Sequence, residues 1–463
     1  MSIAKSYMPF KNPSFRGWIG TGREDITPPV GIFARNWGAA KHEVSAGVHL
    51  PLTLTCFSFQ TDEKDAPLFL ISADLGWWKS AADERQLREG ILNALALEPY
   101  QLMFCLTHTH AGPSTFSEDA NKPGGHFIIP YLESVKQAAI SACKSALANA
   151  SLATLSWNYS KCDLAKNREL PEEGTDRILT GFNVLKPADD TLLVGRLTDA
   201  NGTIIGSIVN YACHPTTLGA ANDLISPDYV GALRLVVEGS TNAPCLFLQG
   251  ASGELAPAEQ YSGDTTLADQ YGRQLGYATL AALEAMQLPQ TALEFTGVVE
   301  SGATLAMWNK TTFLPDATKQ AEMKLVSLPL KDLPTLAEIE AAWEQCTDHV
   351  IKERLWRQRG IRKTIGDGDT SNMPLWVWRL GDAVLVGQPN EAYAAFQQQL
   401  REQLAPAAVA VINIVNGYAG YLPPASSYHD QSYAVWQTPF APGSLELLTA
   451  SATAISQRMI LSK

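Results

Sequence analysis

Two histidines two positions apart are the residues of this sequence best suited to chemistry. His108 and His110 lie in the string Leu106-Thr-His-Thr-His-Ala-Gly-Pro113, where an apolar strand pattern runs into a Gly-Pro turn. Side chains at i and i+2 of an extended chain lie on the same face, so both imidazoles can point into one cleft. Neutral imidazole is the commonest protein ligand of zinc. The pair therefore favours a metal site over two packed core histidines.

Three further apolar runs end at a residue that can bind a metal ion. One run precedes His214, a second precedes Glu391, and a third leads into the string Gly-Tyr-Ala-Gly-Tyr421. Ligands of α/β proteins gather at the carboxyl ends of strands. Two histidines and one carboxylate are a common catalytic zinc set that leaves a position open for water. Together the four strand ends predict one shared metal site.

Short apolar runs and amphipathic helical patterns alternate along the chain. The strand patterns lie at 52–59, 66–72, 102–106, 192–197, 204–212, 245–248, 383–386 and 409–415. The helical patterns lie at 87–95, 131–150, 228–238, 265–286, 336–358 and 391–404, the last one opened by Glu391 and capped by Asn390. This mixed order predicts the α/β class, with mixed β-sheets packed together, flanked by α-helices, and the metal site at the C-terminal ends of strands.

Composition narrows the classes of partner. The 463 residues are 46% hydrophobic and 18% charged, as in globular proteins, and the net charge is −12. An acidic chain argues against a nucleic-acid partner and against anionic lipid head groups. No apolar run reaches the roughly 18 residues of a membrane helix, and Met1–Phe10 lacks the apolar core of a signal peptide. The seven cysteines form no C-x-x-C motif, so we expect buried thiols and a cytoplasmic location. The oligomeric state is left open.

The stretch 304–370 differs from the rest in its charge. It is predicted to be a charged helical insertion, and it carries a basic run from Lys352 to Lys363. The run fits an anion-binding patch or a solvated helix face. The second interpretation is favoured, because positive residues dominate only locally.

Five short motifs in a fixed order resemble the neutral (alkaline, non-lysosomal) ceramidases. They are Gly20-Thr-Gly-Arg-Glu-Asp-Ile-Thr-Pro28, Thr107-His-Thr-His-Ala-Gly-Pro113, Cys213-His-Pro-Thr-Thr217, Ser252-Gly-Glu-Leu-Ala-Pro257 and Gly417-Tyr-Ala-Gly-Tyr421. The resemblance spans about residues 18 to 440. It implies a single ceramidase-like catalytic domain over 1–463 and a role in sphingolipid metabolism. The immunoglobulin-like domain that follows in those ceramidases is not expected in this sequence.

The resemblance also implies the site residues and the reaction. The implied zinc ligands are His108, His214, Glu391 and Tyr421, and the implied catalytic residues are His110, Arg168 and Tyr433. The expected activity is zinc-dependent hydrolysis of the carbon–nitrogen (amide) bond of a small-molecule or lipid-like N-acyl substrate by metal-activated water. His110 would move the proton, and Arg168 and Tyr433 would donate hydrogen bonds to the developing oxyanion.

One departure from the family pattern leaves alternatives open. Ala256 stands where the ceramidases have a serine, and alanine can neither attack nor donate a hydrogen bond. The chain is then also compatible with a zinc esterase for a small soluble substrate, or with a catalytically inactive, metal-stabilised binding protein. Other hydrolases fit less well. Gly112 stands where metallo-β-lactamase relatives carry aspartate, and Gly250-Ala-Ser-Gly-Glu254 lacks the last glycine of a nucleophile elbow.

Overall fold

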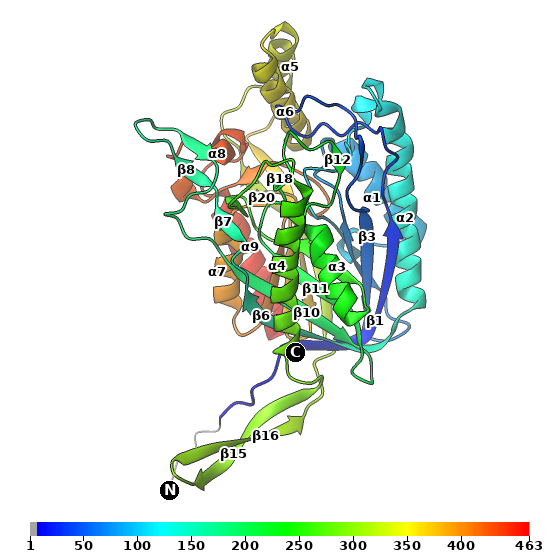
Figure 1. Cartoon of the computed structure of the whole chain (residues 1–463), viewed down its shortest axis with the longest axis vertical. Helices are drawn as coiled ribbons and strands as arrows, with labels where there is room; N and C mark the ends of the chain where they lie inside the picture. Colours follow the sequence, from blue (N-terminus) through cyan, green and yellow to red (C-terminus); the bar gives the residue numbers. More distant parts are fainter. Residues whose placement is uncertain (1–6, 463) are drawn as a thin grey trace.

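Two β-sheets stack face to face between two layers of helices (Figure 1). The structure is a computed structural model that describes residues 7–462, apart from the side chains of residues 349 and 350. The first six residues of the Met1–Phe10 segment lie outside the described residues. The predicted α/β class, with mixed sheets flanked by helices, is confirmed.

The larger sheet has eight strands and mixed strand directions. In spatial order they are β13 (Cys245–Gln249), β11 (Ile204–Tyr211), β10 (Thr191–Thr198), β6 (Ser151–Lys161), β1 (Ser14–Asp25), β3 (Thr53–Gln60), β4 (Leu68–Ala73) and β5 (Leu102–Leu106). The two outermost pairs, β11 with β13 and β4 with β5, are parallel, and the pairs between them are antiparallel.

The smaller sheet has four strands. In spatial order they are β17 (Lys319–Pro329), β18 (Thr370–Leu380), β19 (Ala383–Gly387) and β21 (Ala408–Ile412). Its inner face packs on the larger sheet through fully buried side chains such as Trp376, Trp378 and Leu385, which meet Phe57 and Phe59. Large apolar residues on both inner faces exclude water over a wide area, and this burial is the main stabilising contribution to the sandwich.

Helices cover both outer faces. The larger sheet carries α1 (Ala81–Leu95), α2 (Ile128–Ala148), α3 (Tyr229–Thr241) and α4 (Thr265–Glu284); the smaller sheet carries α7 (Ala394–Leu404) and α9 (Ser444–Leu461). Ser80 and Asp264 are the N-caps of α1 and α4. Each side chain accepts a hydrogen bond from a backbone N–H in the first turn of its helix. None of the helices within residues 7–462 is long and apolar enough to cross a membrane.

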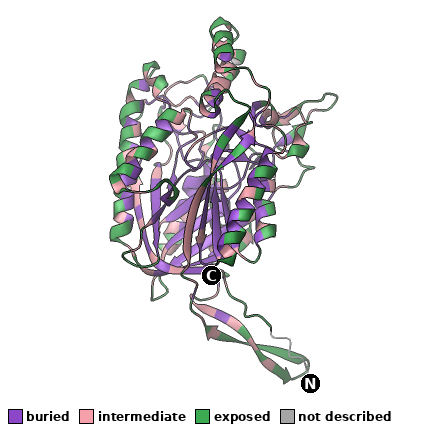
Figure 2. Cartoon of the chain, turned by 180° about the vertical axis from the view of Figure 1, so that it is seen from behind, coloured by how far each residue is buried: buried purple, intermediate pink, exposed green. Residues whose placement is uncertain are grey.

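The stretch 304–370 is helical only in part. It contains β16 (Thr304–Thr312), which pairs with β15 (Thr291–Glu300) in a hairpin that projects from the body and is largely exposed (Figure 2). Next comes β17, which belongs to the smaller sheet because Val326 and Leu328 are buried there. Two helices follow, α5 (Leu336–Gln345) and α6 (His349–Ile365), in place of one helix over 336–358. The single-domain organisation over 1–463 stays a prediction.

Several short elements connect the longer helices and strands. They are β2 (Gly47–Val48), β7 (Ala165–Asn167), β8 (Glu169–Pro171), β9 (Ile178–Thr180), β12 (Leu224–Ile225), β14 (Leu255–Pro257), β20 (Glu391–Ala392), β22 (Tyr421–Leu422) and α8 (Tyr433–Gln437), with 3₁₀ turns at Pro99–Gln101, Ser117–Asn121, Gly125–Phe127 and Ala425–Ser427. The predicted helix start at Glu391 is wrong. Residue 391 pairs with Tyr421 in parallel register, and its N–H donates to the Gly420 carbonyl, so α7 begins only at Ala394.

A buried ion pair ties α3 to the loop that follows β4. Asp74 is fully buried and accepts hydrogen bonds from Arg234 Nη1 at 3.0 Å and from the Thr53 N–H at 2.8 Å. Arg234→Met would leave this carboxylate without its counter-charge, and we expect it to lower the free energy of unfolding by about 3–5 kcal/mol. Urea unfolding measures this loss. Adding Asp74→Asn should restore part of the loss, whereas a loss below about 1 kcal/mol in the single variant would contradict the prediction.

Candidate metal centre

His108 is held at the end of β5 by an unusual backbone conformation. Its φ is +70°, a left-handed value that residues other than glycine rarely adopt. Its Nδ1 lies 3.0 Å from the Gly76 carbonyl oxygen. A carbonyl oxygen can only accept, so Nδ1 carries the proton and the Nε2 lone pair is free. That Nε2 is buried and has no hydrogen-bond partner among the described residues. Strain at a buried, unsatisfied imidazole is typical of a functional position.

His214 follows β11 and is oriented in the same way. Its Nδ1 lies 2.7 Å from the Ser252 carbonyl oxygen, so Nδ1 carries the proton and Nε2 carries none. The Nε2 atom faces Glu391 Oε2 at 2.7 Å. A lone pair and a carboxylate oxygen at this distance repel one another unless a proton or a cation lies between them. This pair of atoms therefore fits a bound cation.

His110 completes a cluster of three imidazoles. Neither of its ring nitrogens has a hydrogen-bond partner among the described residues, and its ring lies between Trp37 and Trp77, with centroids 5.1 and 4.9 Å away. One nitrogen from each of His108, His110 and His214 lies within 4.8 Å of the others. The three histidines can therefore hold a metal ion, and His110 is placed as a possible ligand as well as the predicted proton acceptor.

The protonation states suit a metal. Burial, reinforced by the neighbouring histidines, lowers the pKa of His110 well below its usual value. Burial and the charge of Arg168 lower the pKa of His214 to about 4. Burial by itself would raise the pKa of Glu391, but His108 and His214 hold it well below the usual range. Neutral imidazoles beside an ionised carboxylate are the forms that bind a divalent cation.

Glu391 is fixed on two sides. Its Oε2 lies 3.5 Å from His108 Nε2, and its Oε1 accepts a hydrogen bond from the Tyr418 hydroxyl at 2.7 Å. The motif Gly417-Tyr-Ala-Gly-Tyr421 contains Tyr418, but the sequence alone does not indicate this contact. Partners of this kind orient a carboxylate that binds a metal.

Arg168 and Tyr421 line the other side of the cluster. Arg168 lies between β7 and β8, and its Nη2 donates to the Tyr421 hydroxyl at 2.9 Å and to the Gly253 carbonyl at 2.8 Å. The same nitrogen lies 3.2 Å from His214 Nε2. Burial raises the pKa of Tyr421 well above its usual value, so its hydroxyl is protonated in the absence of a metal.

Tyr433 begins α8 and packs against Tyr421, with ring centroids 5.7 Å apart. Its hydroxyl accepts a hydrogen bond from Arg357 Nη1 at 3.0 Å, so its own proton remains available for donation. The structure thus brings together all seven residues that the sequence singled out, His108, His110, Arg168, His214, Glu391, Tyr421 and Tyr433. Which of them bind the metal and which act on a substrate stays a prediction.

Sequence reasoning missed the contribution of α6. The predicted solvated helix face is wrong for part of the basic run, because the Arg362 side chain is only 5% exposed and Arg357 reaches Tyr433. Trp37 was also missed. Nothing local in the sequence signals these contacts, because Arg357 and Tyr433 lie 76 positions apart.

Ala256, where the family serine was expected, lies in β14 and is fully buried. It pairs with Lys166 of β7, two residues before Arg168. This position therefore supports the strand that leads into the centre, and its side chain offers no hydrogen-bonding atom.

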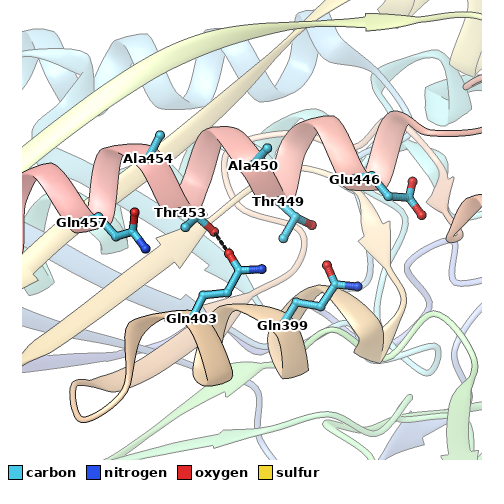
Figure 3. A pocket seen from close by; sticks show the side chains of 8 residues that line it. All are labelled: Gln399, Gln403, Glu446, Thr449, Ala450, Thr453, Ala454 and Gln457. Atoms are coloured by element: carbon cyan, nitrogen blue, oxygen red, sulfur yellow. Dashed lines mark hydrogen bonds between the residues drawn. The ribbon is translucent and has the colours of Figure 1, made fainter.

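Two hollows differ in their relation to the centre. A groove of about 350 Å³ lies between α7 and α9, is lined largely by polar residues such as Gln399 and Gln403, and includes none of the predicted site residues (Figure 3). A much smaller hollow of about 10 Å³ adjoins Arg168, Gly253 and Tyr433. Its volume is close to that of a single water molecule.

The fold and the centre together define an α/β protein whose buried histidine cluster can hold a metal ion. The family model described as neutral/alkaline non-lysosomal ceramidase, N-terminal, matches residues 18–257. This match covers more than half of the 463 residues, and the chain belongs to that family. The resemblance expected from the motifs is confirmed.

Relatives and solved structures agree with this assignment. The neutral ceramidase of Pseudomonas aeruginosa is 22% identical over 469 residues, which cover 92% of this chain and 69% of that protein. The neutral ceramidase of Drosophila melanogaster is 26% identical over 246 residues, but only 32% of its length is matched. The crystal structure of the Pseudomonas aeruginosa neutral ceramidase superimposes with a TM-score of 0.69 at 17% identity, covering 97% of this chain and 75% of that chain. At this identity the superposition establishes the shared fold.

Proposed function

We propose that this protein is a zinc-dependent hydrolase that cleaves the carbon–nitrogen bond of an N-acyl substrate. The observation that carries the proposal is the convergence of three imidazoles and one carboxylate, in which His108 Nε2 and both ring nitrogens of His110 have no hydrogen-bond partner among the described residues. A nitrogen-rich set with one carboxylate is typical of catalytic zinc. The family assignment supports amide hydrolysis, because the relatives that match this chain are named neutral ceramidases.

His108, His214, Glu391 and Tyr421 would hold the ion. Zinc bound there supplies an acidified water and a Lewis acid for the substrate carbonyl. Both are needed for an amide, whose carbonyl is a poor electrophile.

The remaining residues would handle protons and charge. His110, neutral and without a hydrogen-bond partner in the described part of the chain, accepts the proton from the attacking water and returns it to the leaving amine. Arg168 and Tyr433 donate hydrogen bonds to the oxyanion as it develops on the substrate. The Trp37 and Trp77 rings beside His110 limit the access of bulk water to this proton.

A panel of N-acyl amides and the matching esters tests the proposal, with ceramide as one member. We expect release of the amine from at least one amide, loss of turnover after chelation, and recovery on addition of zinc. Turnover of esters alone would point to the esterase. Stoichiometric zinc binding without turnover of any member would point to the inactive binding protein.

A further inference from the structure

We propose that Arg357 of α6 binds a carboxylate carried by the substrate, which makes this enzyme selective for anionic N-acyl compounds such as N-acyl amino acids. The inference rests on the proposed function, because it assigns a substrate class to the same site. The inference is based on the position of the Arg357 guanidinium next to the Tyr433 hydroxyl, and on the N–H groups of Arg357 that form no hydrogen bond with the described residues.

Packing fixes α6 over the centre. Ile361 Cδ1 lies against Gly420, the residue before Tyr421, where an added Cβ would be 3.3 Å away. The Trp356 ring meets Phe116 at 5.7 Å, edge to face. Arg359 forms ion pairs with Glu118 of the body and with Glu340 of α5. These contacts hold one face of the helix against the loops that carry the site.

Arg357 has more hydrogen-bonding capacity than its neighbours use. Its Nε donates to Glu353 at 3.2 Å and its Nη1 donates to Tyr433 at 3.0 Å. Its Nη2 forms no hydrogen bond with the described residues, although the side chain is only 27% exposed. The Glu353 side chain is 43% exposed, so this ion pair is weak and water-facing. The planar guanidinium fork is suited to a second carboxylate.

A second cation, Lys79, lies close enough to Arg357 for their charges to interact. The Lys79 ammonium sits 5.5 Å from the centroid of Trp77 and 6.0 Å from that of Trp356. Trp77 in turn contacts His110. Burial lowers the pKa of Lys79 to about 8 against the opposing effect of Asp119, and the charge of Arg357 adds to the lowering.

The balance of charge above the centre is positive. The cations Lys79, Lys122 and Arg357 lie near two carboxylates, Asp119 and Glu353, and Glu353 already pairs with Arg357. Ceramide has no charge that these cations could bind. An N-acyl amino acid, by contrast, carries a carboxylate two bonds from the amide nitrogen. Arg357 can therefore bind that group while Tyr433, one hydrogen bond away, contacts the scissile amide.

The test compares an N-acyl amino acid with its primary carboxamide, which has the same shape without the charge. Binding is measured by calorimetry on metal-free protein, so that the carboxylate cannot be drawn by a metal ion, and turnover is measured with zinc. We expect the wild type to prefer the acid at least about tenfold in both measurements. Arg357→Gln should abolish the preference and leave the carboxamide within about threefold. Arg354→Gln, one turn earlier and stacked on Trp436, should behave as the wild type.

The outcomes separate this inference from the proposed function. Selective binding of the acid that depends on Arg357 supports the inference, even if no compound is hydrolysed, in which case the proposed function alone fails. Equal turnover of acid and carboxamide by the wild type overturns the inference while the hydrolase stands. If Arg357→Gln lowers turnover of both compounds equally and leaves binding unchanged, Arg357 only positions Tyr433, and the inference is overturned.

Discussion

Replacing His214 by alanine is expected to remove the bound metal and, with it, measurable amide hydrolysis. The His214 ring is the one most tightly oriented in the centre, with Nδ1 held by the Ser252 carbonyl and Nε2 facing Glu391. Loss of a residue that only hydrogen-bonds to a metal ligand usually lowers metal affinity by about 10–100-fold. Loss of a ligand itself should therefore lower it by more than about 100-fold. Zinc affinity by competition with a chelator, and turnover at saturating zinc, measure the two effects.

The controls for this prediction come from the same chain. His108→Ala should act like His214→Ala, because Nδ1 of each ring faces a backbone carbonyl and one nitrogen of each belongs to the same three-histidine cluster. His126→Ala changes an exposed histidine in the turn Gly125–Phe127 and should alter neither quantity. Thermal melting confirms that each variant is folded. If folded His214→Ala keeps zinc and turnover within about threefold of the wild type, the proposed metal centre is wrong.

Arg168→Met is expected to lower kcat by about 10²–10³-fold with little change in KM. The side chain is buried, and one of its nitrogens contacts Tyr421, His214 and Gly253 within 3.2 Å. A donor placed where negative charge develops stabilises the transition state more than the bound substrate. Steady-state kinetics on the best amide of the panel, with zinc content measured in parallel, provide the test.

Two companion measurements sharpen the interpretation of Arg168. Arg168→Lys keeps the charge but loses the planar fork, so it should recover only part of kcat. Zinc content should stay near the wild-type value in both variants, because Arg168 is a donor and not a ligand. A kcat within about threefold of the wild type in Arg168→Met would remove Arg168 from the mechanism. A parallel loss of zinc would reassign it to the support of the metal ligands.

The small hollow beside Arg168 and Tyr433 bears on the choice of substrate. It has room for about one water molecule, and α6 packs over the adjoining loop. The buried alanine at position 256 removes the hydroxyl expected from the ceramidases. Neither feature carries a charge, so the proposed preference for an anionic substrate rests on Arg357.

Much of the fold followed from local patterns. The apolar stripes of α2 and α4 reflect one face against a sheet and one face toward water, so their periodicity is visible without tertiary structure. The start of α7 could not be predicted in this way. Glu391 suits the first turn of a helix, yet pairing with Tyr421, thirty positions later, holds it in a strand.

The sequence by itself determined which residue types could form the centre. His108 and His110 share a strand end, His214, Glu391 and Tyr421 follow other strand ends, and five ordered motifs identified the family. The tertiary structure decided what surrounds them. The close approach of the three imidazoles, the hydrogen bond from Tyr418 to Glu391, and the contact between Arg357 and Tyr433 arise only when distant segments pack together. Local periodicity records which face of an element is buried, but it carries no information about which distant side chain lies opposite.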